Sequence, residues 1–208
     1  MGTHRPPAFF LSGSLGLDFL NTLATPIDEQ VDWIHDGDGL LSWLEQAGLV
    51  PGKTLKALKA QAMPGEIDSV AAQARNLREW FRGFLKARAG RKLMAEDLRA
   101  LEPLNRLLDR DERFNQIVAG SMDEEPILKL QTLRRWRSPE SLLLSIGEEI
   151  ANFVCGEDFQ YAKACEGSTC TLLFVDRTRG PGRRWCSMAI CGNRAKQAAH
   201  RNRRKTDR

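Results

Sequence analysis

The sequence predicts an α+β protein: a mainly helical N-terminal domain with a small β-hairpin, residues 1–160, followed by a zinc finger, residues 161–208. Three observations predict this division. Apolar residues recur at helical spacing in the first part, four of the five cysteines form two pairs in the second, and basic residues gather at its end. A chain of 208 residues has room for one ordinary domain and a small second one.

The N-terminal helices are predicted from the spacing of apolar residues. A short apolar segment at 15–23 predicts a first helix, and Leu40–Ala47 predicts a second that ends at Gly48. The clearest helical period, with spacing 4, 3, 4, 3, predicts a core helix that carries Val70, Ala74, Leu77, Phe81 and Phe84. Residues 95–110 are also helical in pattern, but Pro103 must break the helix, kink it or begin another.

A change of pattern after residue 113 predicts a hairpin. Two short apolar runs, 114–119 and 127–133, flank a turn segment at 120–126. A further helix then begins at Ser138 and Pro139, which supply a cap and a first-turn proline, and its apolar face carries Leu142, Ile146, Ile150 and Phe153. We interpret Cys155, near the end of this face, as a small core residue.

The other four cysteines give the most specific signal in the chain. Cys165 and Cys170 form one C-x4-C pair, and Cys186 and Cys191 form another after fifteen intervening residues. Two such pairs can enclose one tetrahedral zinc ion. Disulfides and inert buried thiols are the alternatives, but disulfides need an oxidising compartment and the N-terminus makes a poor secretory signal. Because so small a unit cannot order itself by apolar burial alone, we expect one structural zinc ion with a closed ligand shell.

The segments around these cysteines predict the remaining elements of the finger. Thr171–Asp176 is typical of a strand, the glycines and proline at 180–182 form a turn, and Arg184–Cys186 returns as the partner strand. Ala195–Lys205 contains neither Gly nor Pro and predicts a helix. Knuckle, hairpin, knuckle and helix follow one another as in a treble-clef-like finger.

The charge of the chain is strongly asymmetric. Residues 177–208 contain eleven Lys or Arg and one acid, a net charge of +10, so the rest carries −6 of the total of +4. A basic end of this kind suggests a nucleic-acid partner, although it can also be merely solvated. Arg194 and Arg201 share one helix face and are the candidate base readers, whereas Trp185 stacks on a base or belongs to the finger core. The predicted nucleic-acid-binding residues are Arg183, Arg184, Arg194, Lys196, Arg201, Arg203, Arg204 and Lys205.

Two motifs resemble known families. Residues 184–194, ending in Cys191-Gly192-Asn193-Arg194, resemble the CGNR zinc finger family, with upstream support from residues 173–176 and the first cysteine pair. The string Gly16-Leu17-Asp18-Phe19-Leu20-Asn21-Thr22, followed by residues 41–44 and 48–49, is similar to the ABATE domain that accompanies this finger in bacterial proteins. The resemblance implies a stress-induced transcription regulator with a zinc-dependent, DNA-binding finger.

Three polar residues of the N-terminal string have two interpretations. Asp18, Asn21 and Thr22 line a small-molecule pocket, or they cap a helix and join buried hydrogen bonds, which such residues do routinely. The first interpretation would make the N-terminal domain a sensor for an effector. The second would give these residues a purely structural role.

The leading functional hypothesis is therefore a zinc-dependent, DNA-binding transcription regulator whose N-terminal domain senses an effector or forms a homodimer. An RNA-binding or protein-interaction finger is the alternative, since a fold does not fix a function. We expect no enzyme, because no nucleophile–base pair, phosphate-binding loop or open metal site is recognisable. No apolar run is long enough to cross a membrane, and we expect a cytoplasmic protein.

Overall fold

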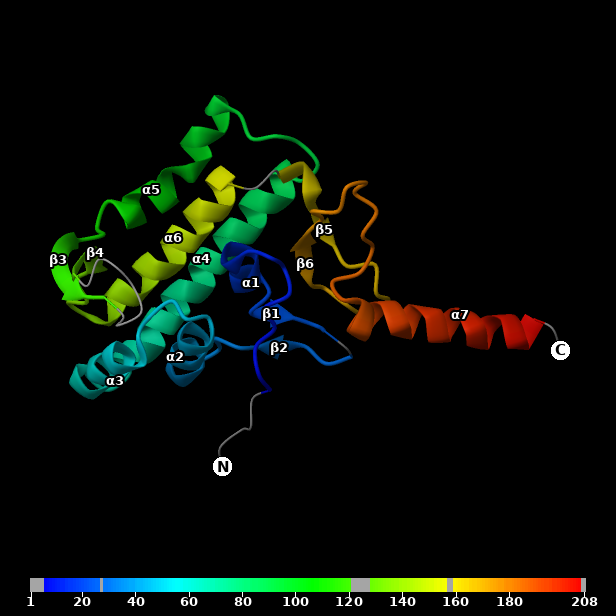
Figure 1. Cartoon of the computed structure of the whole chain (residues 1–208). Helices are drawn as coiled ribbons and strands as arrows, with labels where there is room; N and C mark the ends of the chain where they lie inside the picture. The colour runs from blue at the N-terminus through cyan, green and yellow to red at the C-terminus, as the bar shows by residue number, and fades with distance from the viewer. Residues whose placement is uncertain (1–5, 27, 121–127, 157–158, 207–208) are drawn as a thin grey trace.

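The computed structural model describes residues 6–206 except 27, 121–127 and 157–158. Helices pack side by side to form the body, small antiparallel strand pairs lie at its margins, and the C-terminal helix extends away from it (Figure 1). The helices of the body are α1 (Leu15–Leu20), α2 (Gly37–Gln46), α3 (Gly52–Gln61), α4 (Glu66–Arg88), α5 (Glu102–Leu108) and α6 (Leu142–Gly156). This arrangement confirms the predicted mainly helical first part.

The core is built around α4, which contacts α1, α2 and α6. The predicted helical period is confirmed, because Val70, Ala74 and Phe81 on α4 are fully buried. Phe81 meets Phe153 of α6 edge to face, with ring centroids 5.9 Å apart. Helix α1 crosses α6 so closely that a Cβ at Gly16 would lie 2.6 Å from a backbone oxygen of α6. Only glycine fits at this crossing.

The helix ends follow the local signals in the sequence. Gly48, which follows the C-cap residue Ala47 of α2, has φ of +68°, the left-handed conformation that ends many helices. Pro103 lies in the first turn of α5, so it begins a new helix after a 3₁₀ segment, Ala95–Leu101. Ser138 caps a 3₁₀ turn that leads into α6. Helix α3 was not singled out from the sequence, and only Leu55 and Leu58 of it are buried.

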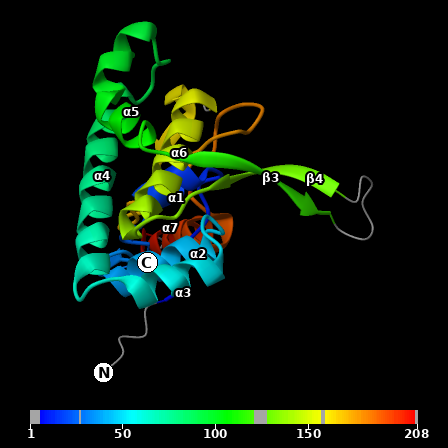
Figure 2. The same ribbon diagram turned by 90° about the vertical axis from the view of Figure 1, so that its left-hand side faces the viewer.

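The predicted hairpin is confirmed as β3 (Arg113–Ala119) paired antiparallel with β4 (Leu128–Arg134). Its predicted turn segment falls almost wholly outside the described residues. The hairpin projects from the helical body (Figure 2), and three apolar residues toward its far end are largely exposed: Ile117, Leu128 and Leu130. A second strand pair, β1 (Leu23–Ala24) with β2 (Val31–Asp32), follows α1.

The C-terminal part contains β5 (Ala162–Ala164), β6 (Leu173–Val175) and α7 (Asn193–Thr206). The predicted strand and basic helix are confirmed, but the predicted strand partner is wrong. β6 pairs with β5, and Arg184 instead accepts a hydrogen bond at its carbonyl oxygen from the N–H of Glu166. The reason is that β5 leads directly into the connection 165–172, which carries the first cysteine pair and returns the chain as β6.

Cys155 also departs from expectation. Its side chain is exposed, whereas Phe153 two residues earlier is buried. Phe153 lies three positions after Ile150 and shares its face of the helix. Cys155 lies two positions further on, so its side chain points away from the core. Among the described residues, no helix is long and apolar enough to cross a membrane.

Candidate metal centre

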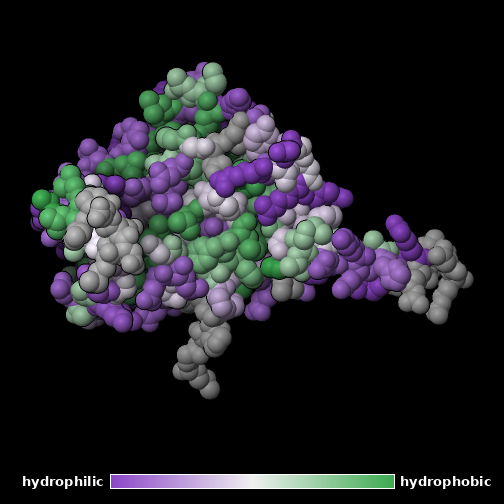
Figure 3. All heavy atoms as spheres, viewed as in Figure 1, coloured by the Kyte–Doolittle hydropathy of each residue, from purple (hydrophilic) through white to green (hydrophobic). Residues whose placement is uncertain are grey.

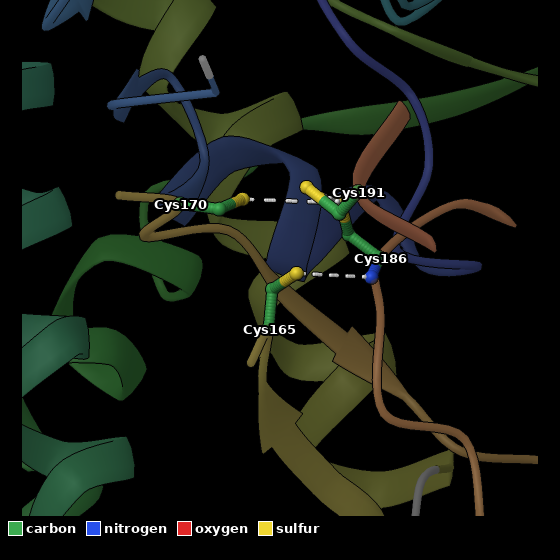
Figure 4. Close-up of side chains that lie close together, drawn as sticks. All are labelled: Cys165, Cys170, Cys186 and Cys191. Atoms are coloured by element: carbon green, nitrogen blue, oxygen red, sulfur yellow. Dashed lines mark hydrogen bonds between the residues drawn. The ribbon is translucent and has the colours of Figure 1, made fainter. Parts of the chain in front are cut away.

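The four paired cysteines converge at the base of α7. Cys165 and Cys170 flank the turn between β5 and β6, while Cys186 and Cys191 approach from the segment that becomes α7. Their side chains point toward one another (Figure 4), all four are buried, and the sulfur atoms lie within 4.8 Å of one another. The sequence therefore predicted a set of residues that the fold does bring together.

The spacing of the sulfur atoms fits a tetrahedral metal. The Sγ atom of Cys186 lies 3.9 Å from that of Cys170 and 3.7 Å from that of Cys191. Four thiolates at the usual Zn–S distance would be separated by about 3.8 Å. All five cysteines of the chain are free of disulfides. The donor set and its geometry therefore fit one zinc ion held by four cysteines.

Backbone geometry fixes each pair of ligands. The N–H of Cys170 bonds to the carbonyl oxygen of Gly167, and the N–H of Cys191 bonds to that of Ser187, which closes one turn in each pair. The Sγ atom of Cys165 accepts N–H groups from Gly167 at 3.4 Å and Cys186 at 3.3 Å. Such N–H···S bonds orient the ligand atoms and stabilise their negative charge.

Gly167 is required by the close approach of the two turns. A Cβ atom there would lie 3.0 Å from Cys170 Cβ and 3.1 Å from Cys191 Sγ. Nothing in the sequence pattern singled out this glycine, because the approach arises only when both turns meet at the metal centre.

Crowding separates the pKa values of the thiols. The neighbouring Cys186 side chain lowers the pKa of Cys170 to about 5, while burial raises the pKa of Cys191 to about 12. The hydrogen bond with Cys170 also raises the pKa of Cys186. Four adjacent thiolates thus require a cation, and metal binding must release protons.

Comparison with protein-family models gives two matches. Residues 13–157 match the ABATE family, described as "Putative stress-induced transcription regulator". The chain belongs to the ABATE family. Residues 162–204 match the CGNR zinc finger, and no curated protein matches the chain. Cys165, Cys170, Cys186 and Cys191 are the metal site of this finger, which holds one structural zinc ion.

The ABATE region holds the CGNR finger through the outer edge of β6. The side chain of Asn21, at the end of α1, accepts the N–H of Leu173 and donates to its carbonyl oxygen, both at 2.9 Å. On either side, the N–H of Val175 bonds to Ser12 and that of Thr171 bonds to Thr25. Every second residue from 171 to 175 is therefore paired either with the ABATE match, at Thr25 and Asn21, or with Ser12 just before it.

The other two polar residues of the N-terminal string are also bound within the protein. Asp18 Oδ1 accepts the N–H groups of Leu11 and Ser12, and burial raises the pKa of Asp18. Thr22 donates to the Phe19 carbonyl oxygen and accepts from Arg78, a buried residue of α4. These contacts are those expected if the three residues join buried hydrogen bonds.

The basic residues predicted to bind nucleic acid fall into separate groups. Arg183 turns inward, where its guanidinium donates to the carbonyl oxygens of Trp185 and Cys186 and lies 4.3 Å from the ring of Phe174. Arg184 is paired with Glu166 at 2.6 Å. Both therefore make contacts that support the finger itself.

Trp185 is half-buried and packs against the core, with the Arg184 guanidinium 5.0 Å from its ring centre. Its surroundings agree with a place in the finger core, although one part of the ring remains accessible.

The basic residues on α7 are more exposed. Arg194 contacts Asp28, in the loop between β1 and β2, at 3.2 Å. The exposed lysine and arginine side chains farther along the described part of α7 are those of Lys196, Arg201 and Arg203. Arg204 and Lys205 belong to α7, but their side chains lie outside the described residues.

Sequence reasoning missed two residues that organise the site. The sequence pattern indicates no role for Asn21 in joining the two parts, and it places Asp176 only at the end of a predicted strand. Buried Asp176 accepts Lys163 at 2.8 Å, Thr178 at 2.6 Å and the N–H of Arg183 at 2.8 Å. It thereby fixes the loop that delivers Cys186. An acid directly after a buried strand was the only available signal.

Proposed function

We propose that this protein is a zinc-dependent, DNA-binding transcription regulator that contacts DNA through α7. The observation that carries the proposal is the unpaired charge of this helix. Lys196, Arg201 and Arg203 form no ion pair with any residue in the described part of the chain, and α7 contains no acidic residue. Hydrophilic side chains cover most of the projecting helix (Figure 3). Phosphates are the natural partners of such a surface.

Helix geometry separates these cations into two faces. Arg194 and Arg201 are seven residues apart and lie on one side of α7, beside the first cysteine turn. Lys196 and Arg203 are also seven residues apart, on roughly the opposite side. A helix lying in a DNA groove can therefore reach phosphates on both flanks, while only one face meets the base edges.

The zinc centre supports this role by fixing the base of α7. Cys191 lies in the turn, Met188–Gly192, that leads directly into α7, so a zinc ion bound there would anchor the start of the helix to the rest of the finger. With four cysteine ligands, the metal has no open position for a substrate, which supports our proposal that the protein is not an enzyme.

We propose that the ABATE region has a regulatory role and either senses an effector or forms a dimer. We propose a stress response as its biological setting. The family description and the shared edge of β6 support this assignment. A zinc site made of four thiolates needs reduced cysteines, and this supports a cytoplasmic location.

The test compares two matched double variants of the full-length, zinc-loaded protein. Arg194→Gln with Arg201→Gln removes one face, and Lys196→Gln with Arg203→Gln removes the other. If both residues of a pair contact phosphates, the slope of log affinity against log salt should fall by about 1.8 in magnitude on duplex DNA. A remote control, Lys56→Gln with Lys59→Gln on α3, should leave the slope unchanged.

Two outcomes would contradict the proposal. If both α7 variants keep the wild-type affinity and salt slope, α7 is not the DNA surface. If the wild type prefers single-stranded or duplex RNA of the same sequence and the variants lose that binding, the finger is an RNA-binding module. A protein-interaction finger would bind neither nucleic acid.

A further inference from the structure

A groove lies between one side of α3 and the base of the β3–β4 hairpin. It has a volume of about 580 Å³, within the range of small-molecule sites, and its wall on α3 includes Lys53, Ala57 and Leu58. Phe114 and Trp136 line the opposite wall.

The groove has an excess of positive charge. No acidic residue lines it, whereas Lys53, Arg134, Arg135 and Arg137 do. Two of these cations are already neutralised. Arg134 makes two bonds to Asp111 and one to Glu148, and Arg137 binds both carboxylate oxygens of Glu112.

The other two cations are available to a ligand. Lys53 and Arg135 form no ion pair with any residue that the structure describes, and Arg135 lies over the ring of Phe114 at 4.6 Å. The half-buried ring of Trp136, which has the Arg134 guanidinium 5.4 Å from its centre, and the largely buried side chain of Leu58 supply apolar surface beside them. Cations next to aromatic rings suit a ligand that is both planar and negatively charged.

We propose that this groove binds a small aromatic carboxylate, whose carboxylate pairs with Lys53 and Arg135 while its ring lies against Trp136. The neighbouring hollow offers no excess of positive charge to a continuing phosphate chain, because its three acids, Asp109, Glu112 and Glu140, are balanced by three arginines, Arg110, Arg135 and Arg137. The groove also lies at the end of the molecule opposite α7 (Figure 1). This site is therefore separate from the proposed DNA surface and does not depend on it.

The experiment uses 2-naphthoate as the probe and 2-naphthalenemethanol, which has the same rings without the charge, as its control. The indole N–H signals of the five tryptophans are followed by NMR in the full-length, zinc-loaded protein. Trp136→Phe identifies the signal of Trp136. We expect 2-naphthoate to shift that signal in a saturable manner and the neutral analogue to leave it nearly unchanged.

Charge removal gives the second readout. Lys53→Gln and Arg135→Gln should each raise the dissociation constant of 2-naphthoate about five-fold, the scale of one exposed ion pair. Lys56→Gln, on the same helix but outside the groove, should leave it unchanged. The proposal is overturned if the Trp136 signal does not move at millimolar probe, if the neutral analogue binds equally well, or if Lys53→Gln binds like the wild type.

Discussion

The ABATE region and the CGNR finger are ordered by different interactions. The ABATE region buries large side chains between helices, among them Phe19, Trp43 and Phe81. Between Cys165 and Cys191 the finger buries mainly Leu172, Phe174 and Val175 beside its four cysteines. Apolar burial grows with the size of a domain, so we expect the small unit to depend on a metal for its folding and the large one to fold without it. We therefore expect loss of the metal to unfold the finger and to leave the helical region folded.

The two parts are nevertheless not independent. Thr171, Leu173 and Val175 direct backbone groups of the finger to the ABATE region, and Thr169 contacts Asp28 at 3.3 Å. An exposed strand edge would otherwise leave these groups to solvent. The boundary at residue 160 stays a prediction, and the finger strand behaves as part of a shared interface.

The largest expected effect tests the dependence on metal. Cys186→Ser opens the closed ligand shell, and structural zinc contributes on the order of 10 kcal/mol to folding. Zinc content should fall from about one ion per chain to near zero by elemental analysis, and the indole signal of Trp185 should lose its dispersion. The signals of Trp43 and Trp80 should remain.

Cys155→Ser provides the matched control, because Cys155 is exposed and outside the cluster. It should keep its zinc and all five indole signals. A Cys186→Ser protein that retains stoichiometric zinc would show that these four residues are not the ligand set.

A smaller effect is expected at the joint between the two parts. Asn21→Ala leaves the N–H and C=O groups of Leu173 without their partner, at a cost of about 2 to 4 kcal/mol. The finger should then unfold at lower urea than the helices. Zinc release to a chromogenic chelator, followed alongside far-UV circular dichroism, separates the two transitions.

Asn152→Ala is the control for the joint, because the exposed side chain of Asn152 bonds, among the residues that the structure describes, only to Glu149 on the same helix. It should leave the midpoints of both transitions at their wild-type values. If zinc release and loss of helix coincide in Asn21→Ala as in the wild type, the side chain does not hold the two parts together.

The smallest effect concerns acid stability of the ABATE region. Hydrogen bonds from Arg134 and Arg113 lower the pKa of Asp111 below its usual value. A carboxylate with a lowered folded-state pKa stabilises the protein above about pH 4, and this contribution is lost as the pH falls through the folded-state value.

Asp111→Asn should therefore reduce the free energy of unfolding by on the order of 1 kcal/mol at neutral pH. The difference from the wild type should shrink below about pH 4, as measured by thermal unfolding of the helical signal. Glu102→Gln, which removes an exposed pair with Arg106, should change little. If the difference in free energy of unfolding between Asp111→Asn and the wild type grew on acidification, the pKa of Asp111 would be raised rather than lowered in the folded protein.

Local sequence patterns determined most elements of the fold and the metal site. The spacing of Val70, Ala74 and Phe81 fixed the core helix, because helical periodicity depends only on neighbours along the chain. The cysteine pairs fixed the zinc ligands for a similar reason, since each pair belongs to one tight turn. The charge asymmetry likewise depends on composition alone.

Tertiary structure decided what depends on contacts between distant residues. Residues 21 and 173 meet only after folding, so neither the partner of β6 nor the role of Asn21 followed from sequence. The same holds for Arg183, whose charge pointed to nucleic acid but whose guanidinium is bound to backbone carbonyls. The type of a side chain determines which hydrogen bonds and ion pairs it can form, whereas tertiary packing determines which partner groups lie within reach.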